Sequence, residues 1–258
     1  MYVLPWGLTL GPIYHSNSLV SYILPSISLC HTHNNKDNKI ETKNRNLNNN
    51  SSNERVHKPD IISILIGSLL GDLYAERRGP STRFAIKQSD THKEYIYYLH
   101  NILYKEGYCS SNIQKGTTTA SNKSLKRYTY YRFKTYSFSS LNWIYDLFYI
   151  NGIKIVPLNI SEYLTPLALA IWIMDDGSKS QSGGLILSTE GFDKTSIDLL
   201  CSVLSNKYGL MVTTPKNGVN RQGNSRYRIY VSANSMLKLR SIIKPYIIPS
   251  MSYKIDKF

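Results

Sequence analysis

The chain has 258 residues, of which 41% are hydrophobic, and a formal net charge of +14 from 31 basic and 17 acidic side chains. The hydrophobic content is sufficient for a core and excludes a wholly disordered basic protein, while the charge favours a polyanionic partner, with nucleic acid as the first candidate. Cys30, Cys109 and Cys201 are far apart, which excludes a C-x-x-C zinc site and argues against a disulfide scaffold.

The first 58 residues form a segment that we expect to be disordered and to lie outside the folded region. Residues 1–30 are apolar, but three prolines interrupt them, so no run approaches the roughly 20 residues of a membrane-spanning helix. No charged signal region or arginine-rich presequence is present. Residues 34–53 contain nine asparagines and cannot form a core. We therefore expect no membrane association and a folded part that begins near Asp60.

The folded region begins with an apolar helical pattern. Residues 61–70 are apolar on every side, which is typical of a buried helix. Gly67 and Gly71 are four residues apart and leave one side of this helix free for close approach to another helix. The elements expected next are a strand at 83–88, a helix at 93–108 that ends at Gly107, a strand at 128–138 and a helix at 141–150.

A similar series of elements recurs about one hundred residues later. It comprises an apolar helix at 167–176, a strand at 185–189, an amphipathic helix at 195–208 ended by Gly209, strands at 210–214 and 227–231, and a helix at 235–243. The order helix–strand–strand–helix–strand–strand–helix in each cycle predicts an α+β fold of two halves, residues 60–158 and 159–258. A single irregular α+β domain is the alternative.

Each apolar helix ends in carboxylates. Asp72 follows the first helix, and Asp175 and Asp176 end the second. An acid at a helix C-terminus meets the negative end of the helix dipole, and a divalent cation is one way to compensate for that cost. If the helices pack together, both carboxylates and the carbonyls of Gly71 and Asp175 converge on one cleft as hard oxygen ligands suited to Mg²⁺. The alternative is two core helices that end in solvated aspartates.

These segments resemble the paired motifs of LAGLIDADG homing endonucleases, in the branch that carries both motifs in one chain. The resemblance covers about residues 60–258, and the matching stretches are 65–72, 164–166, 169–177, 243–251 and 253–254. It implies two pseudo-symmetric αββαββα halves whose motif helices form the interface and whose antiparallel sheets form a DNA-binding saddle. The chain departs from the family pattern at Leu73, where glycine is usual, and at Ile171 and Asp175, where small residues are usual.

The resemblance also implies roles for individual residues. It makes Asp72 and Asp176 the catalytic carboxylates that bind Mg²⁺, one for each DNA strand, with the carbonyls of Gly71 and Asp175 as further ligands. It places a basic catalytic residue in each half, at Lys154 and Lys254, and a water-positioning polar residue at Gln88 and Glu190. A lysine at these positions would polarise water or stabilise charge on phosphorus, and the alternative is an ordinary surface lysine.

Basic residues and tyrosines interleave in the expected strands. Because alternate residues share one face of a strand, Arg132 and Lys134 would face one way, as would Arg226 and Arg228. An exposed basic face fits contact with a DNA groove and its phosphates, and a solvated sheet face is the alternative. The predicted DNA-binding residues are Arg83, Lys87, Arg132, Lys134, Arg226 and Arg228.

The activity implied by the resemblance is site-specific, Mg²⁺-dependent cleavage of double-stranded DNA by a monomer. It would leave 5′-phosphate and 3′-hydroxyl ends with short 3′ overhangs, and it would copy the host intron into intronless alleles. Residues 2–7 resemble a stretch of mitochondrial cytochrome b, which implies a reading frame entered from an upstream exon. The protein would then be made inside mitochondria without a cleavable presequence.

Two other functions on the same fold remain open. One is an RNA maturase that helps its own intron to splice, with or without nuclease activity. The other is a transcription regulator, which needs no metal site. Neither function requires both Asp72 and Asp176, and the presence of both carboxylates favours the nuclease.

Overall fold

The computed structural model describes residues 56–119 and 127–256, all of which belong to one structural unit. The predictions for residues 1–55, including the cytochrome b-like stretch and the asparagine-rich segment, lie outside the described residues. Within the described ranges, no helix is long and apolar enough to cross a membrane. These ranges contain helices and antiparallel sheets, which confirms the α+β class.

The first half of the described chain alternates helices with pairs of strands, as predicted. Its elements are α1 (Pro59–Leu70), β1 (Tyr74–Arg78), β2 (Ser81–Ser89), α2 (Lys93–Lys105), β3 (Gln114–Thr119), β4 (Arg127–Lys134) and α3 (Asn142–Phe148). The strands form one antiparallel sheet in the order β1-β2-β4-β3. Buried Ile86 and Gln88 on β2, and Tyr131 and Phe133 on β4, alternate with more exposed residues, so one face of this sheet packs on the core.

The second half has the same order of helices and an equivalent sheet. Its elements are α5 (Pro166–Asp176), β7 (Gly177–Lys179), β8 (Leu185–Leu187), α6 (Lys194–Tyr208), β9 (Val212–Thr213), β10 (Lys216–Val219), β11 (Ser225–Tyr227), β12 (Ile229–Val231) and α7 (Met236–Ile243). The sheet order β7-β8-β12-β9 matches that of the first half, and β10 and β11 form a separate hairpin. This agreement confirms the expected αββαββα plan, with one added hairpin.

Shorter elements connect these parts. The hairpin of β5 (Tyr149–Ile150) and β6 (Ile153–Lys154) and the helix α4 (Ile160–Tyr163) lie between α3 and α5. The 3₁₀ helices are η1 (Asp90–His92), η2 (Ser139–Leu141), η3 (Ala233–Ser235), η4 (Lys244–Tyr246) and η5 (Pro249–Lys254). Among them, β6 and η5 matter for the site because each carries one of the predicted basic residues.

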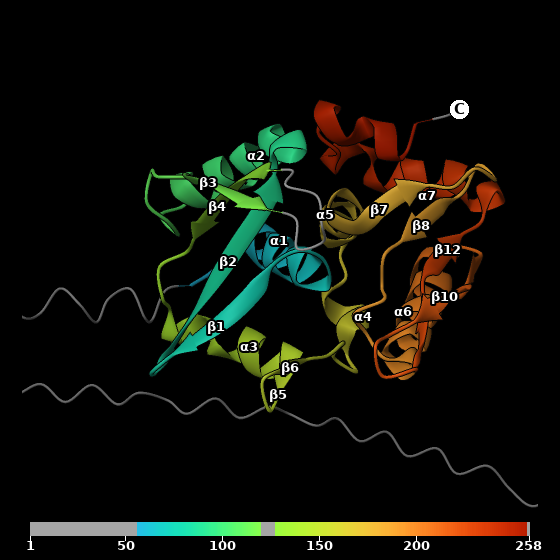
Figure 1. Ribbon diagram of the computed structural model, residues 1–258, viewed down its shortest axis with the longest axis horizontal. Helices are drawn as coiled ribbons and strands as arrows, with labels where there is room; N and C mark the ends of the chain where they lie inside the picture. The colour runs from blue at the N-terminus through green and yellow to red at the C-terminus, as the bar shows by residue number, and fades with distance from the viewer. Residues whose placement is uncertain (1–55, 120–126, 257–258) are drawn as a thin grey trace, which may run out of the picture. The chain divides into compact units, whose positions relative to one another are not determined.

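Helices α1 and α5 lie side by side between the two sheets (Figure 1). A Cβ atom built on Gly67 would overlap the carbonyl oxygen of Ala168 and lie 2.9 Å from the Cβ of Ile171. A Cβ atom on Gly71 would lie 2.5 Å from the Cβ of Asp175. The predicted close approach is therefore confirmed, and the two larger residues of the second motif fit opposite the two glycines of the first.

Local signals explain where the two helices begin. Pro59 and Pro166 stand in the first turn of α1 and α5, where a missing amide hydrogen costs no helical hydrogen bond. The side chain of Thr165 accepts a hydrogen bond from the amide of Ala168 at 3.1 Å and donates one to the hydroxyl of Ser63 at 2.9 Å. Thr165 therefore caps α5 and also ties its start to α1.

Several predicted boundaries were wrong, because these elements end earlier than their local patterns predict. The helices predicted at 93–108 and 141–150 end at Lys105 and Phe148, and the strands predicted at 128–138, 185–189 and 210–214 are Arg127–Lys134, Leu185–Leu187 and Val212–Thr213. Residues 149–150 form β5 because Asn151 and Gly152, both with positive φ, make the turn of a hairpin.

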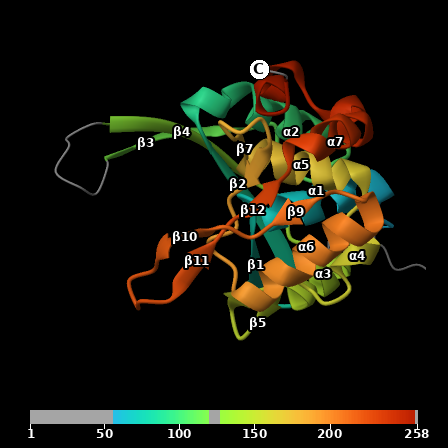
Figure 2. The same ribbon diagram turned by 90° about the vertical axis from the view of Figure 1, so that its right-hand side faces the viewer.

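The strand predicted at 227–231 is also wrong, because it is interrupted at Arg228. The amide of Arg228 donates to the carbonyl of Pro215, which separates β9 from β10 on the neighbouring strand. Proline has no amide hydrogen, so the regular ladder cannot continue past it. Figure 2 shows the β10–β11 hairpin that results extending to the same side of the motif helices as β3 and β4.

Candidate active site

The predicted acidic residues meet where α1 and α5 end. Gln88 of β2 connects them, because its Nε2 donates to Asp72 Oδ2 at 2.8 Å and to Asp175 Oδ1 at 3.3 Å. The amide of Asp72 also lies 3.4 Å from Asp175 Oδ2. The close approach at Gly71 makes this contact between the two helix ends possible.

Lys154 and Lys254 occupy equivalent places at the two helix ends. Lys154 of β6 donates to the carbonyls of Gly71 at 3.2 Å and Leu73 at 2.9 Å. Lys254 of η5 donates to the carbonyl of Asp175 at 2.9 Å and to that of Met174. Each ammonium group thus neutralises the negative end of one motif helix, and it does so at the carbonyls that the resemblance makes metal ligands.

Burial and crowding of like charges shift the pKa values of this cluster. Burial, together with the charge of Asp72, raises the pKa of Asp175 well above its usual range, and the same two causes raise the pKa of Asp176 to about 7. Burial lowers the pKa of Lys154 to about 8 and lowers that of Lys254, although the three carboxylates oppose the change. Such desolvated clusters of mixed charge are typical of functional sites.

The oxygen atoms at the helix ends fit a divalent cation that is only partly enclosed by protein. The described residues contain no group of three or more His, Cys, Asp or Glu side chains arranged to hold a metal ion. Mg²⁺ rarely needs such a cage, because it uses one or two carboxylates and completes its shell with water and substrate phosphate. Three crowded acids, two of them with raised pKa values, are also the groups whose charged form a nearby cation favours.

The two predicted water-positioning residues have different surroundings. Gln88 contacts the carboxylates directly. The Glu190 carboxylate instead accepts hydrogen bonds from Arg228 and, at 2.7 Å, from Asn217 Nδ2. Burial opposes the change, but these partners lower the pKa of Glu190, and its charge helps to raise the pKa of Asp176. The charge of Glu190 therefore acts on Asp176, but its hydrogen bonds are with Asn217 and Arg228 and not with the carboxylates of the cluster.

Sequence reasoning missed three further side chains at this site. The Nδ1 of His92 lies 3.2 Å from Gln88 Oε1, and its Nε2 lies 3.2 Å from the hydroxyl of Tyr253. The buried hydroxyl of Tyr95 interacts with the carboxyl of Asp175 and lies 3.4 Å from the carbonyl of Ile171. Two sequence signals were available: Gln88 and His92 are four residues apart at the junction of β2 and α2, and Tyr253 directly precedes Lys254.

The predicted DNA-binding residues separate into two groups. In the first sheet, Lys87 pairs with Arg132 and Lys134 with Ala85, so the predicted common face of Arg132 and Lys134 is confirmed. Arg83 stands on the same face, opposite Glu76 of β1. In the second half, Arg226 is exposed on β11, whereas Arg228 lies between β11 and β12 and is ion-paired with Glu190.

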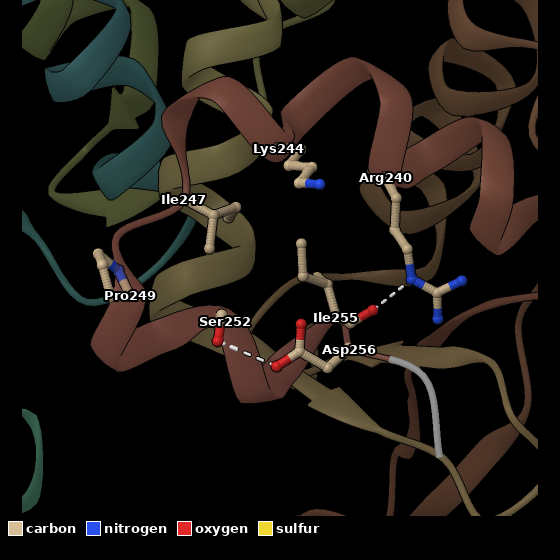
Figure 3. A pocket seen from close by; sticks show the side chains of 7 residues that line it. All are labelled: Arg240, Lys244, Ile247, Pro249, Ser252, Ile255 and Asp256. Carbon is tan, nitrogen blue, oxygen red and sulfur yellow. Dashed lines mark hydrogen bonds between the residues drawn. The ribbon is translucent and has the colours of Figure 1, made fainter.

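A separate cavity of about 320 Å³ lies among α7, η4 and η5 (Figure 3). Its lining residues are Arg240, Lys244, Ile247, Pro249, Ser252, Ile255 and Asp256. Arg240 Nε donates to the carbonyl of Ile255, and the hydroxyl of Ser252 donates to Asp256 at 3.0 Å. None of these lining residues belongs to the predicted site, although Ile255 directly follows Lys254 in the chain.

Known proteins resemble this chain over most of the described residues. The sequence model of the LAGLIDADG DNA endonuclease family matches residues 62–239. The cytochrome b mRNA maturase bI2 of Debaryomyces hansenii is 40% identical over 201 residues, which cover 77% of this chain and 74% of that protein. The cytochrome b mRNA maturase bI2 of Saccharomyces cerevisiae is 40% identical over 225 residues and 84% of this chain, but the chain spans only 51% of its length.

An endonuclease and a solved structure are also similar. The intron-encoded endonuclease ai4 of Dictyostelium discoideum is 37% identical over 163 residues, which cover 62% of this chain and 98% of that protein. The homing endonuclease I-WcaI, solved bound to its DNA recognition sequence, aligns with a TM-score of 0.70 and 23% identity over 83% of this chain and 96% of its own. This likeness confirms the fold. The family match and the identity to its relatives together show that the chain belongs to the LAGLIDADG DNA endonuclease family.

Proposed function

We propose that this protein is a site-specific endonuclease that cuts both strands of DNA and mediates the mobility of its host intron. The observation that carries the proposal is the equivalent arrangement at the ends of α1 and α5. At each end a carboxylate, Asp72 or Asp176, stands next to a carbonyl that accepts a hydrogen bond from Lys154 or Lys254. Two such sets in one chain match the need to hydrolyse two phosphodiester bonds.

In this proposal the side chains at each helix end prepare one phosphodiester bond for hydrolysis. The chemistry supplied by a bound divalent cation, for which we propose Mg²⁺, is Lewis-acid stabilisation and a water of lowered pKa. Asp72 and Asp176 would each supply a negatively charged oxygen ligand. The hydrogen bond from Gln88 orients the carboxylate of Asp72. Lys154 and Lys254 keep positive charge close to where charge develops on phosphorus. Water adds to phosphorus, the 3′ oxygen leaves with a proton, and 5′-phosphate and 3′-hydroxyl ends with short 3′ overhangs result.

The sheets are the proposed DNA-binding surface. Arg83, Lys87, Arg132 and Lys134 share one face of the first sheet, and Arg226 is exposed on the β10–β11 hairpin. Both regions extend to one side of the motif helices (Figure 2). Long double-stranded DNA lying across both sheets would therefore reach the carboxylates between them. Because both motif helices belong to one chain, the protein would act as a monomer.

An RNA maturase is the second candidate, and the relatives favour it. Two proteins named cytochrome b mRNA maturases are 40% identical to this chain. Their names also support a cytochrome b intron as the host and mitochondria as the location. The two activities are compatible, because one surface could cut DNA while the same chain binds its intron RNA.

A cleavage selection tests the proposal directly. The full chain is incubated with Mg²⁺ or EDTA and with two plasmids, one carrying an intronless cytochrome b segment and the other a library of randomised duplexes. We expect Mg²⁺-dependent double-strand cleavage at one recoverable sequence. No cleavage of either substrate, together with tight binding to the intron RNA, would replace the nuclease with the maturase. Failure to cut DNA and to bind RNA would contradict both.

A further inference from the structure

Glu76 is an acidic side chain at one end of the basic face of the first sheet, on the edge strand β1. It pairs with Arg83 across β1 and β2, and its Oε2 lies 2.6 Å from Arg83 and 3.0 Å from Arg78. Its Oε1 lies 3.1 Å from the ammonium group of Lys134 on β4. One carboxylate thus holds three cations from three strands, and its side chain is only 18% exposed.

Glu76 carries its charge at any pH at which the protein would work. Burial alone would raise the pKa of Glu76, but hydrogen bonds from Arg83, Lys134 and Arg78 outweigh burial and lower it to about 2. The carboxylate therefore cancels part of the positive charge of the face and removes conformational freedom from three long side chains. Free arginine and lysine side chains lose that freedom only when they bind.

The other end of the same face has no such acid. Lys87 lies over the ring of Tyr130 at 4.0 Å, and Arg132 Nε donates to Gln114 Oε1 at 2.9 Å. Among the described residues, neither side chain has an acidic partner. The face is therefore divided into cations that are fixed and partly neutralised, and cations that keep their full charge.

This division matters because phosphate and base contacts need different things. Attraction to phosphates depends on net charge and carries no sequence information, whereas readout of base edges depends on an accurately placed donor. A carboxylate among the donors weakens the first and improves the second. We propose that Glu76 is a specificity-determining positioning residue, which holds its three cations for base contacts and leaves phosphate attraction to Lys87 and Arg132. This inference rests on the proposed DNA-binding function.

The test compares target and unrelated DNA in one binding experiment. The full chain and its Glu76→Gln variant are titrated in EDTA with the duplex recovered by cleavage selection and with an unrelated duplex of equal length, at several salt concentrations. We expect the variant to bind unrelated DNA more tightly and to discriminate about tenfold less between the two duplexes. The slope of log affinity against log salt should steepen by about 0.9, the effect of one more phosphate contact.

Two further variants separate charge from position. Asp146→Asn removes an acid of helix α3 that pairs with Arg77, so it makes the same change of net charge away from the basic sheet face. This variant should discriminate like the wild type. Glu76→Asp keeps the charge on a shorter side chain, so it should keep the wild-type salt slope but lose discrimination. Thermal unfolding of each variant identifies any loss of fold, and Glu76→Asp serves as the test if Glu76→Gln does not fold.

The outcomes distinguish this inference from the proposed function. Unchanged discrimination in Glu76→Gln, or an equal loss in Asp146→Asn, would overturn the role of Glu76 while the proposed function stood. A variant that lost affinity for the target alone would also overturn it, because Glu76 would then contact a base itself. If the wild-type chain selected no target sequence, the proposed function would fail, and this inference with it.

Discussion

The two motif helices solve the same packing problem with different residues. Helix α1 has Gly67 and Gly71 on the side that faces its partner, whereas α5 has Ile171 and Asp175 at the facing positions. A symmetric interface would need small residues on both helices. Here the glycines of α1 make room for the larger side chains of α5. The two backbones therefore approach closely although only α1 has glycines at the contact. The pseudo-symmetry is one of backbones and not of side chains.

The same asymmetry continues at the candidate active site. Asp72 is exposed and bonded to Gln88, whereas Asp176 is partly buried and Glu190, the counterpart of Gln88, is bonded to Arg228. Only the lysines are equivalent, since each donates to the backbone carbonyl directly before an aspartate, that of Gly71 before Asp72 and that of Asp175 before Asp176. Groups that bind backbone can be kept equivalent by the fold, while groups that bind side chains depend on each local sequence.

The largest expected effect comes from removing either carboxylate. Asp72→Asn and Asp176→Asn should each lower double-strand cleavage by on the order of a thousandfold, because each removes a negative ligand from one helix end. Gel-shift affinity for the selected target should change little. Cleavage rates and affinities measured on the same preparations provide the check. Loss of DNA binding by a variant with a normal circular dichroism spectrum would count against the metal-site assignment.

The next largest effect tests the glycine side of the helix interface. Gly67→Ala places a Cβ on the carbonyl oxygen of Ala168, which is backbone and cannot move aside without shifting α5. We expect a loss of about 3 kcal/mol in the free energy of unfolding, measured by urea denaturation. Gly191→Ala is the control, since a Cβ there meets nothing within 4 Å, and it should cost less than about 1 kcal/mol. Similar losses in both variants would contradict the packing argument.

The sequence was sufficient to predict those features that depend on local patterns. Apolar runs and the spacing of Gly67 and Gly71 predict the two helices and their contact. The interruption at Arg228 was not predicted, because it depends on Pro215 thirteen residues earlier on a neighbouring strand. The partners of Glu190 and the cluster around Glu76 were missed for the same reason. Both depend on strand register, which alternation along one strand does not determine.

Substitution of Lys154 and Lys254 tests the feature that is equivalent at the two helix ends. Lys154→Met and Lys254→Met should each slow cleavage by on the order of a hundredfold without removing DNA binding, because each takes positive charge from one helix end. Lys207→Met is a matched control, since Lys207 on α6 also donates to a backbone carbonyl, that of Ser161 on α4, and neither helix carries a residue of the predicted site. Single-turnover cleavage rates provide the measurement. Unchanged rates in the first two variants would reject a catalytic role for these lysines.

The smallest expected effect concerns Glu76 on β1 and Glu190 in the turn after β8, and it depends on pH. The pKa of Glu76 is lowered to about 2, so its ion pairs stabilise the folded protein fully above the ordinary glutamate pKa of about 4.5, and this stabilisation is lost as the pH falls towards 2. Wild type should therefore exceed Glu76→Gln in free energy of unfolding by about 1 kcal/mol at pH 6, after allowance for solvent screening, and by nothing near pH 2.

Glu190→Gln should lose less, because Glu190 has one cationic partner where Glu76 has three and also lies near Asp176. Urea denaturation at a series of pH values measures both variants. Equal losses would show that Glu76 and Glu190 contribute equally to stability, which would contradict the difference in their number of cationic partners.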